Sequence, residues 1–411
     1  MSPDPLALDA LLSATRRRGV SRRGFLRGAS LSALALSSPG LLAACGTEGA
    51  SQTAGSCVSE DLSSSEKELT FSNWPLYIDE AKVDRGGKKV TVYPTLERFQ
   101  KQSGLTVDYV ADVNDNAEFF GIVRNQLAAC EPTGRDLFAL TDWMAARMIG
   151  LGWIQELDKS NLPNVEANLV DSLRSPSWDK DRKYSVPWQS GLTGIAYNAD
   201  LTGEVKSFDE LLTRSDLKGK VSLLSEMRDT MTFLLLIDGA DPEDFTEDEF
   251  GAACDRLQQA VDGGQIRAFT GNEYAQDLVK GNVVACEAWS GDVIQLQFDN
   301  PNIRFIAPEE GLSLWSDNML VPNKSSHKAN AEQLMDFYYD PKTAAELAAW
   351  VNYICPVAGA QEEMTKIDPS LAENELIFPG VDLLANTYDF MTLDVKTDQK
   401  YQQMFAAVVG S

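Results

Sequence analysis

Histidine is almost absent from this sequence: His327 is the only one among 411 residues. A zinc site built on several imidazoles, or a Ser-His-Asp triad, would have to rely on this one residue. His327 lies in the polar run 323–328, which we expect to be a surface loop. The six cysteines show no Cys-x-x-Cys spacing either. The sequence therefore indicates no metal centre, no cofactor and no catalytic residues, and we do not expect an enzyme.

A phosphate-binding loop and an excess of basic charge are missing as well. The glycines of Arg85-Gly86-Gly87-Lys88 are followed by strand-like residues, whereas a phosphate loop leads into a helix. Lysine and arginine number 36 against 61 acidic residues, which gives a net charge of −25. This charge repels nucleic acids and anionic membrane surfaces, so we expect neither as a partner. It is compatible with a cationic ligand, although many soluble proteins are acidic without one.

The apolar run near the N-terminus, residues 29–44, is too short and too rich in Ser and Gly for a comfortable membrane-spanning helix. It follows a twin-arginine pattern at residues 21–27 (SRRGFLR). We predict that residues 1–44 are a twin-arginine signal peptide. The ending LAAC at 42–45 resembles a bacterial lipobox, which implies lipid on the sulfur of Cys45. We therefore expect an exported lipoprotein, in the periplasm or at the outer face of the cytoplasmic membrane; an ordinary N-terminal anchor is the alternative.

Residues 45–67 contain many small and acidic residues and few large apolar ones. Such a segment cannot bury enough apolar surface to become ordered, so we expect a flexible tether. With Cys45 lipidated, an odd number of cysteines remains, which leaves at least one thiol free. These are Cys57, Cys130, Cys254, Cys286 and Cys355. The sequence leaves open which of them pair.

From about residue 68 the chain is long enough for two lobes, and strand and helix patterns alternate along it. Strands are expected at 69–74, 105–110 and 136–140, and helices at 93–102, 118–130, 274–280, 329–339 and 343–352. A capping box, Thr246-Glu247-Asp248-Glu249, opens a helix that ends at Gly263. The glycine-punctuated segment 186–198 suits a crossover between lobes, and residues 319–322 suit the return strand. The alternation favours an α/β fold with a largely parallel sheet.

Two tryptophan–aspartate pairs stand out between residues 285 and 317. Trp289 precedes Asp292, and Trp315 precedes Asp317. The face of a tryptophan attracts a cation and an aspartate neutralises it, so such pairs suit a site for a small organic amine. A core tryptophan beside a turn aspartate is the alternative for either pair.

A second acidic pair begins a predicted helix. Glu226 and Asp229 are three residues apart just after a predicted strand, so their carboxylates share one face of the first helical turn. Stabilisation of the helix N-terminus by the two acids is the alternative explanation.

Several motifs, in their order along the chain, resemble those of the bacterial polyamine-binding proteins, which are the spermidine and putrescine receptors of ATP-driven importers. They are residues 71–74 (FSNW) with Tyr77, Asp136-Leu137 with Thr141 and Trp143, 217–221 (LKGKV), 289–292 (WSGD), 314–317 (LWSD) and Tyr353 before Cys355-Pro356. The resemblance covers about residues 68–400. It implies a type II periplasmic-binding fold, with two α/β lobes joined by crossover strands around a ligand cleft. Lobe 1 would comprise 68–191 and 316–361, and lobe 2 would comprise 192–315 and 362–411.

The resemblance also implies a ligand site. The aromatic residues of the family fall on Trp74, Tyr77, Trp289, Trp315 and Tyr353, with Thr141 and Trp143 near them. The carboxylates that hold the amino groups fall on Glu226, Asp229, Asp292 and Asp317. The partners implied are a polyamine and the permease of an ABC importer, with the membrane reached only through the lipid; we expect a monomer.

Two departures from the family bear on the choice of ligand. Many relatives have a polar residue and then an acid after Asn73-Trp74, where this chain has Pro75 and Leu76. One amine-binding carboxylate is therefore missing, and a family glutamine has no clear counterpart at 388–391. Alternatives are the same fold with another cation, such as an amino-acid derivative, a thiamine-like compound or a metal chelate. An exported hydrolase and a sensor or adhesion lipoprotein with a degenerate cleft also remain open.

Overall fold

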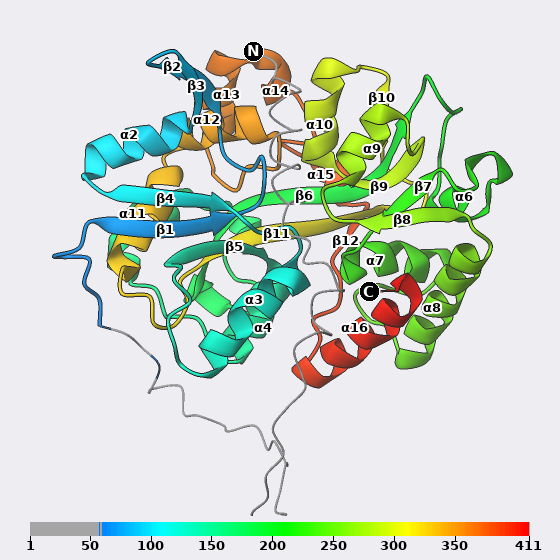
Figure 1. The fold of residues 1–411 in the computed structure, drawn as a ribbon, viewed down its shortest axis with the longest axis horizontal. Coiled ribbons are helices and arrows are strands. Elements are labelled where there is room, and N and C mark those ends of the chain that lie inside the picture. The colour runs from blue at the N-terminus through cyan, green and yellow to red at the C-terminus, as the bar shows by residue number, and fades with distance from the viewer. Residues whose placement is uncertain (1–56, 58–59, 411) are drawn as a thin grey trace, which may run out of the picture. The chain divides into compact units, whose positions relative to one another are not determined.

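The computed structural model describes residue 57 and residues 60–410 (Figure 1). The predicted signal peptide, the predicted lipidation site Cys45 and most of the predicted tether lie outside the described residues. None of the helices within 60–410 combines the length and the apolar character needed to cross a membrane.

One ten-stranded sheet runs through the described body (Figure 1). Its main path is, in order, β4 (Thr106–Ala111), β1 (Glu68–Asn73), β5 (Leu137–Thr141), β11 (Leu312–Leu320), β6 (Ser185–Asn198), β9 (Ala285–Trp289), β7 (Val221–Leu224) and β8 (Ile266–Thr270). Two strands lie off this path: β10 (Ile303–Ile306) pairs with β6, and β12 (Thr387–Tyr388) pairs with β11.

The two long strands β6 and β11 pair antiparallel with each other in the middle of this order. On one side β4, β1 and β5 pair in parallel, and on the other side β9, β7 and β8 do so. All fourteen residues of β6 are buried, as is typical of a strand covered on both faces. The α/β fold with two lobes joined by crossover strands is therefore confirmed.

The helices follow the signals in the sequence to within a few residues. The capping box of α8 is present, with Thr246 and Glu249 each accepting from the other's backbone N–H. Pro94 begins α2, and Gly104 ends it in a left-handed conformation with φ of 75°. The helices are α2 (Pro94–Ser103), α3 (Asn116–Ala128), α4 (Asp142–Gly150), α5 (Pro163–Asn168), α6 (Phe208–Thr213), α7 (Met227–Ile237), α8 (Glu247–Asp262), α9 (Tyr274–Lys280), α10 (Ser290–Asp299), α11 (Lys328–Tyr338), α12 (Pro341–Val351), α13 (Ala360–Ile367), α14 (Pro369–Ala372), α15 (Val381–Leu384) and α16 (Val395–Val409).

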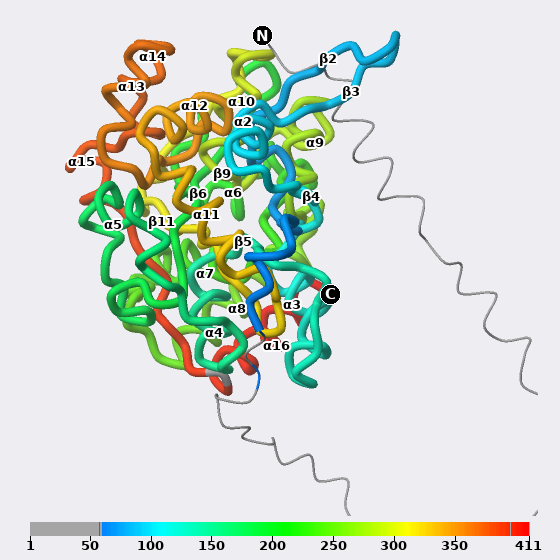
Figure 2. Tube along the Cα trace, turned by 90° about the vertical axis from the view of Figure 1, so that its left-hand side faces the viewer, coloured from blue at the N-terminus to red at the C-terminus, as the bar shows by residue number. Residues whose placement is uncertain are grey.

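Residues 85–88 form the turn of a hairpin between β2 (Ala81–Arg85) and β3 (Lys88–Val92), which agrees with the rejection of a phosphate loop. Gly86 and Gly87 both have a positive φ, which suits a two-residue hairpin turn. The hairpin projects from the body next to α2 (Figure 2).

Two hydrophobic clusters form the core. The first includes β1, β5 and α11–α13 and extends to Trp289 and Ile294, while the second includes β7, α7 and α8. Met364 and Ile377 belong to the first cluster, whereas Tyr401 and Phe405 belong to the second. The clusters therefore do not divide at residue 361, and the lobe boundaries expected from the sequence stay a prediction.

The last part of the predicted tether is held against α11. The backbone N–H of Leu62 donates to the carbonyl oxygen of Ser326 at 2.7 Å, and Ala329 N donates to Asp61 Oδ2 at 3.2 Å. Cys57 forms a disulfide with Cys130, whereas Cys254, Cys286 and Cys355 are free and buried. Composition alone missed the contacts of Asp61 and Leu62 because their partners lie more than 200 residues away along the chain, and it missed the disulfide because Cys130 lies 73 residues from Cys57.

The environment of His327 also differs from the expectation. Only 8% of this residue is exposed, and its ring lies between Glu66 and Asp136. The polar run 323–328 predicted a surface loop, but the docked segment before β1 covers it.

We expect the disulfide to stabilise the fold, because it closes a loop of 73 residues in the unfolded chain. Cys57→Ser should lower the free energy of unfolding by up to about 4 kcal/mol in a denaturant titration. A reductant should destabilise the wild-type protein and leave Cys57→Ser unchanged. Equal stability of wild type and variant under oxidising conditions would contradict the prediction.

Candidate ligand-binding site

A cavity of about 780 Å³ lies at the ends of several strands. All eleven residues predicted to form the ligand site line it: Trp74, Tyr77, Thr141, Trp143, Glu226, Asp229, Trp289, Asp292, Trp315, Asp317 and Tyr353. The tertiary structure thus brings them together, while their binding of a ligand stays a prediction. The volume lies within the range of small-molecule sites.

The topology of the sheet explains why these residues meet. Trp74 follows β1, Thr141 ends β5, Glu226 follows β7 and Trp289 ends β9. The carboxyl ends of parallel strands are where open α/β sheets bind ligands. Asp317 lies on the crossover strand β11 where the pairing register with β6 shifts, and such a bulge redirects a side chain.

Five aromatic rings follow one another along the wall of the cavity. Their successive centroid distances are 6.2 Å for Trp74–Trp289, 6.4 Å for Trp289–Trp315, 5.6 Å for Trp315–Tyr353 and 5.1 Å for Tyr353–Tyr77. Three of the four pairs are edge-to-face, which is a favourable arrangement for aromatic quadrupoles. Since the rings come from the segment after β1, from β9, from β11 and from the segment after α12, the wall requires the complete tertiary fold.

Two glycines allow the rings to approach the backbone. A Cβ atom at Gly191 would collide with the ring of Trp315, and one at Gly291 would lie 2.5 Å from the ring of Tyr353. The sequence showed glycines here, but nothing in it indicated that a tryptophan or tyrosine from elsewhere packs on them.

Hydrogen bonds connect the acids of the cavity to both lobes. Thr141 Oγ1 donates to Asp317 Oδ1 at 2.8 Å, and Asn116 Nδ2 donates to Thr141 Oγ1 at 2.8 Å. Asn116 also donates to Glu226 Oε1, from its backbone N–H at 2.9 Å and from Nδ2 at 3.1 Å. Asn116, at the start of α3, therefore links the two predicted lobes; sequence reasoning missed it.

The other two acids are held by side chains of the wall. Asp292 accepts from the hydroxyl of Tyr353 at 2.7 Å and from that of Tyr274 at 2.8 Å. Asp229 accepts from Thr193 Oγ1 at 2.5 Å and from Trp289 Nε1 at 3.4 Å. In these contacts each carboxylate is oriented by neutral donors, so its charge is not cancelled.

Burial makes ionisation of these acids costly. It raises the pKa of Asp317 to about 7, against the hydrogen bond from Thr141, and the pKa of Asp229 to about 6. Burial and the nearby Asp115 raise the pKa of Glu226, and burial raises that of Asp292. Among the described residues, no lysine or arginine forms an ion pair with any of these four acids. A cation in the cavity would supply the missing charge.

Trp143 has a different environment from the other aromatic residues. The guanidinium carbon of Arg228 lies 3.9 Å from the centre of its ring, so that this face already carries a cation. Arg228 also forms an ion pair with the buried Asp398 at 2.7 Å, and Arg147 pairs with the same carboxylate at 2.9 Å. Since Arg147 lies on α4, Arg228 on α7 and Asp398 on α16, this triad ties three helices together beside the cavity.

The two departures noted in the sequence, at residues 75–76 and at 388–391, both fall on segments that line part of the cavity. Pro75 lines the cavity, whereas Leu76 is not among the lining residues. The segment after α15, where the family glutamine has no clear counterpart, also contributes to the lining; its residues are Thr387, Asp389, Phe390, Thr392, Leu393 and Asp394.

The packing of Gly291 against Tyr353 can be tested through stability. Gly291→Ala should lower the free energy of unfolding by about 1–3 kcal/mol, because the added methyl overpacks a buried ring. Gly121→Ala is the matched control, since its Cβ would contact nothing within 4 Å and alanine favours the helix. Denaturant titrations in which both variants gain stability would contradict the packing.

The raised pKa of Asp317 predicts how stability depends on pH. Its ordinary value is 3.8 and its value in the folded protein is about 7, so the folded protein holds a proton between these pH values that the unfolded chain has lost. Stability from this group is therefore present below pH 4 and is lost as the pH rises to 7. Asp317→Asn cannot ionise, so without ligand it should be more stable than wild type at pH 8, by on the order of 1–4 kcal/mol.

This gain should fall to about a quarter at pH 4.5, where Asp317 is protonated in the folded protein but largely ionised in the unfolded chain. Thermal unfolding at both pH values measures it, with Asp382→Asn as an exposed control. The same stability difference at pH 4.5 and pH 8 would argue against a buried, protonated carboxyl at residue 317.

Comparison with known proteins identifies the family. Residues 95–379 match the bacterial extracellular solute-binding protein family. The chain is 27% identical to spermidine/putrescine-binding periplasmic protein 1 of Haemophilus influenzae, over 76% of this chain and 85% of that protein. It is 28% identical to the putrescine-binding periplasmic protein PotF of Escherichia coli, over 82% and 90%. A Listeria monocytogenes structure described as a spermidine/putrescine ABC transporter superposes with a TM-score of 0.72 at 25% identity, over 84% of this chain and 99% of that one. The chain therefore belongs to the bacterial extracellular solute-binding protein family.

Proposed function

We propose that this protein captures a polyamine, spermidine or putrescine, in the cavity and delivers it to an ABC importer. The observation that carries the proposal is the combination of five aromatic rings with four acids that lack a cationic partner among the described residues. A polyamine is an apolar chain with ammonium groups, so methylenes pack on the rings while ammonium groups pair with the acids.

The electrostatics of the cavity supports a cation over a neutral ligand. Asp317 and Asp229 have a raised pKa because burial disfavours their charged forms, and an ammonium group would reverse that effect. Relatives named for spermidine and putrescine binding, in Haemophilus influenzae and Escherichia coli, support the same ligand class.

The cellular setting belongs to the same proposal. Residues 1–44 act as a twin-arginine signal, and the lipid on Cys45 holds the protein at the outer face of the cytoplasmic membrane or in the periplasm. The protein acts as a monomer that presents its loaded form to the permease, and it has no catalytic role.

A second candidate is a cationic ligand that also carries a carboxylate, such as an amino-acid derivative. Arg147, Arg182 and Arg228 line the cavity together with the acids. However, Arg147 and Arg228 are already paired with Asp398, which leaves them less available to a ligand. The polyamine is therefore the better candidate, and a thiamine-like compound is a third ligand to test.

A thermal-shift screen of the purified protein tests the ligand class. Putrescine, spermidine, spermine and cadaverine should raise the melting temperature to different extents, because a ligand that binds only the folded state stabilises it. Amino acids and thiamine should have no effect. If an amino acid raised the melting temperature and no amine did, the second candidate would replace the polyamine.

The amine found in this way should bind more weakly to two variants. Trp289→Ala removes an aromatic wall and Asp317→Asn removes a charge, so each should cost about 1–3 kcal/mol of binding free energy by calorimetry. Asp382→Asn, on an exposed carboxylate, should bind like wild type. Unchanged affinity in both site variants would remove the basis of the site assignment.

A further inference from the structure

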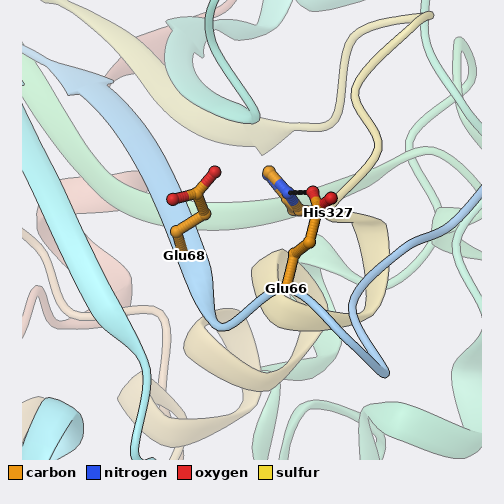
Figure 3. Close-up of side chains that lie close together, drawn as sticks. All are labelled: Glu66, Glu68 and His327. Carbon is orange, nitrogen blue, oxygen red and sulfur yellow. Dashed lines mark hydrogen bonds and ion pairs between the residues drawn. The ribbon is translucent and has the colours of Figure 1, made fainter.

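Three side chains with metal-binding groups lie together at the start of β1 (Figure 3). One donor atom from each of Glu66, Glu68 and His327 falls within 4.8 Å of the others. β1 has six residues and leads to Trp74 in the cavity, so at about 3.3 Å per residue the cluster lies roughly 20 Å from that site. It is therefore independent of the proposed polyamine site.

The imidazole of His327 lies between two carboxylates. Its Nδ1 lies 3.1 Å from Oδ2 of Asp136, and its Nε2 lies 2.8 Å from Oε2 of Glu66. Asp136 is itself held, because it accepts from the backbone N–H of Thr70 at 2.9 Å and from Ser325 Oγ at 2.8 Å. A buried carboxylate behind an imidazole is the arrangement by which proteins orient a metal-binding histidine.

The two glutamates are also positioned by the backbone. Glu66 and Glu68 are two residues apart, and the side chains of both point toward His327 (Figure 3). Asn330 Nδ2 donates to the carbonyl oxygens of both residues, each at 2.9 Å. Within residues 60–410 neither carboxylate forms an ion pair with lysine or arginine. Two neighbouring acids thus face the outward nitrogen of one oriented imidazole.

We propose that Glu66, Glu68 and His327 bind a divalent transition-metal ion of the zinc type, with Asp136 positioning the imidazole. One nitrogen and two carboxylate oxygens are ligands that Zn²⁺ accepts, and water completes its coordination. A hard ion such as Ca²⁺ prefers six to eight oxygen ligands and would not use the histidine. The exposed side chain of Glu68 can rotate to bring its oxygen to about 2 Å from the ion.

Such an ion would fasten the segment that precedes the body. Asp61, Leu62 and Ser63 already contact the start of α11, and Glu66 reaches His327 at the same place. The four residues come from the segment that leads into β1 and from its first residue, from the residue before β5 and from the N-cap of α11. Binding therefore requires the folded state and must stabilise it.

The full chain, without a polyhistidine tag and freed of metals with EDTA, should be titrated with ZnCl₂ by calorimetry. We expect one zinc ion per chain at this cluster. The chain has a single histidine, so the ¹⁵N imidazole resonances report on His327 alone and its Nε2 signal should move. Glu68→Gln and His327→Gln should each weaken zinc binding at least tenfold.

The matched control is Glu131→Gln, on an exposed carboxylate outside the cluster, which should bind zinc like wild type. Glu68 is exposed, so Glu68→Gln should fold even if His327→Gln does not. Zinc affinity unchanged in Glu68→Gln, or Ca²⁺ bound in preference to zinc with the imidazole signal unmoved, would overturn the proposal. Absence of zinc binding would also overturn it and leave the cluster as a hydrogen-bonded anchor.

Discussion

The cavity is organised around one constraint. Its buried acids accept hydrogen bonds from neutral donors but have no ion-pair partner among the described residues. Asp317 accepts from Thr141, and Asp292 accepts from two tyrosine hydroxyls, so each carboxylate is oriented without being neutralised. Burying an uncompensated carboxylate costs several kcal/mol unless it takes up a proton or meets a cation. The rest of the fold supports these carboxylates: aromatic rings line the cavity beside them, and Gly191 and Gly291 let two of those rings, Trp315 and Tyr353, approach the backbone.

The two central strands, β6 and β11, connect the two sides of the cavity. β6 and β11 pair with each other and with strands on both sides, so a residue on β11 such as Asp317 can contact Thr141 of β5. Asn116 reaches across to Glu226, and Asp398 joins Arg147 to Arg228. These contacts hold the two sides of the cavity in one position. Any movement that separates the two sides of the cavity has to break these contacts.

Much of this was predictable from local patterns. The capping box at Thr246 and the crossover segment 186–198 each have a local physical cause, and both are present. The eleven site residues were placed through resemblance to a family, and all of them line one cavity. Predictions from local patterns failed where residues far away in the chain determine the environment of a side chain. His327 was expected at the surface but is buried between two acids. The contact of Arg228 with one face of the Trp143 ring likewise has no signal among neighbouring residues.

The sequence by itself determined the alternation of strands and helices, the acidity of the chain and the chemical types in the site, because periodicity, capping and charge are properties of neighbouring residues. Only the tertiary structure decided which cysteines pair, which acids stay uncompensated and which aromatic face is already occupied. The Cys57–Cys130 disulfide spans 73 residues, and Asp398 lies 170 residues from Arg228. Contacts of that separation depend on how the lobes pack, and a pKa depends on the burial that packing creates.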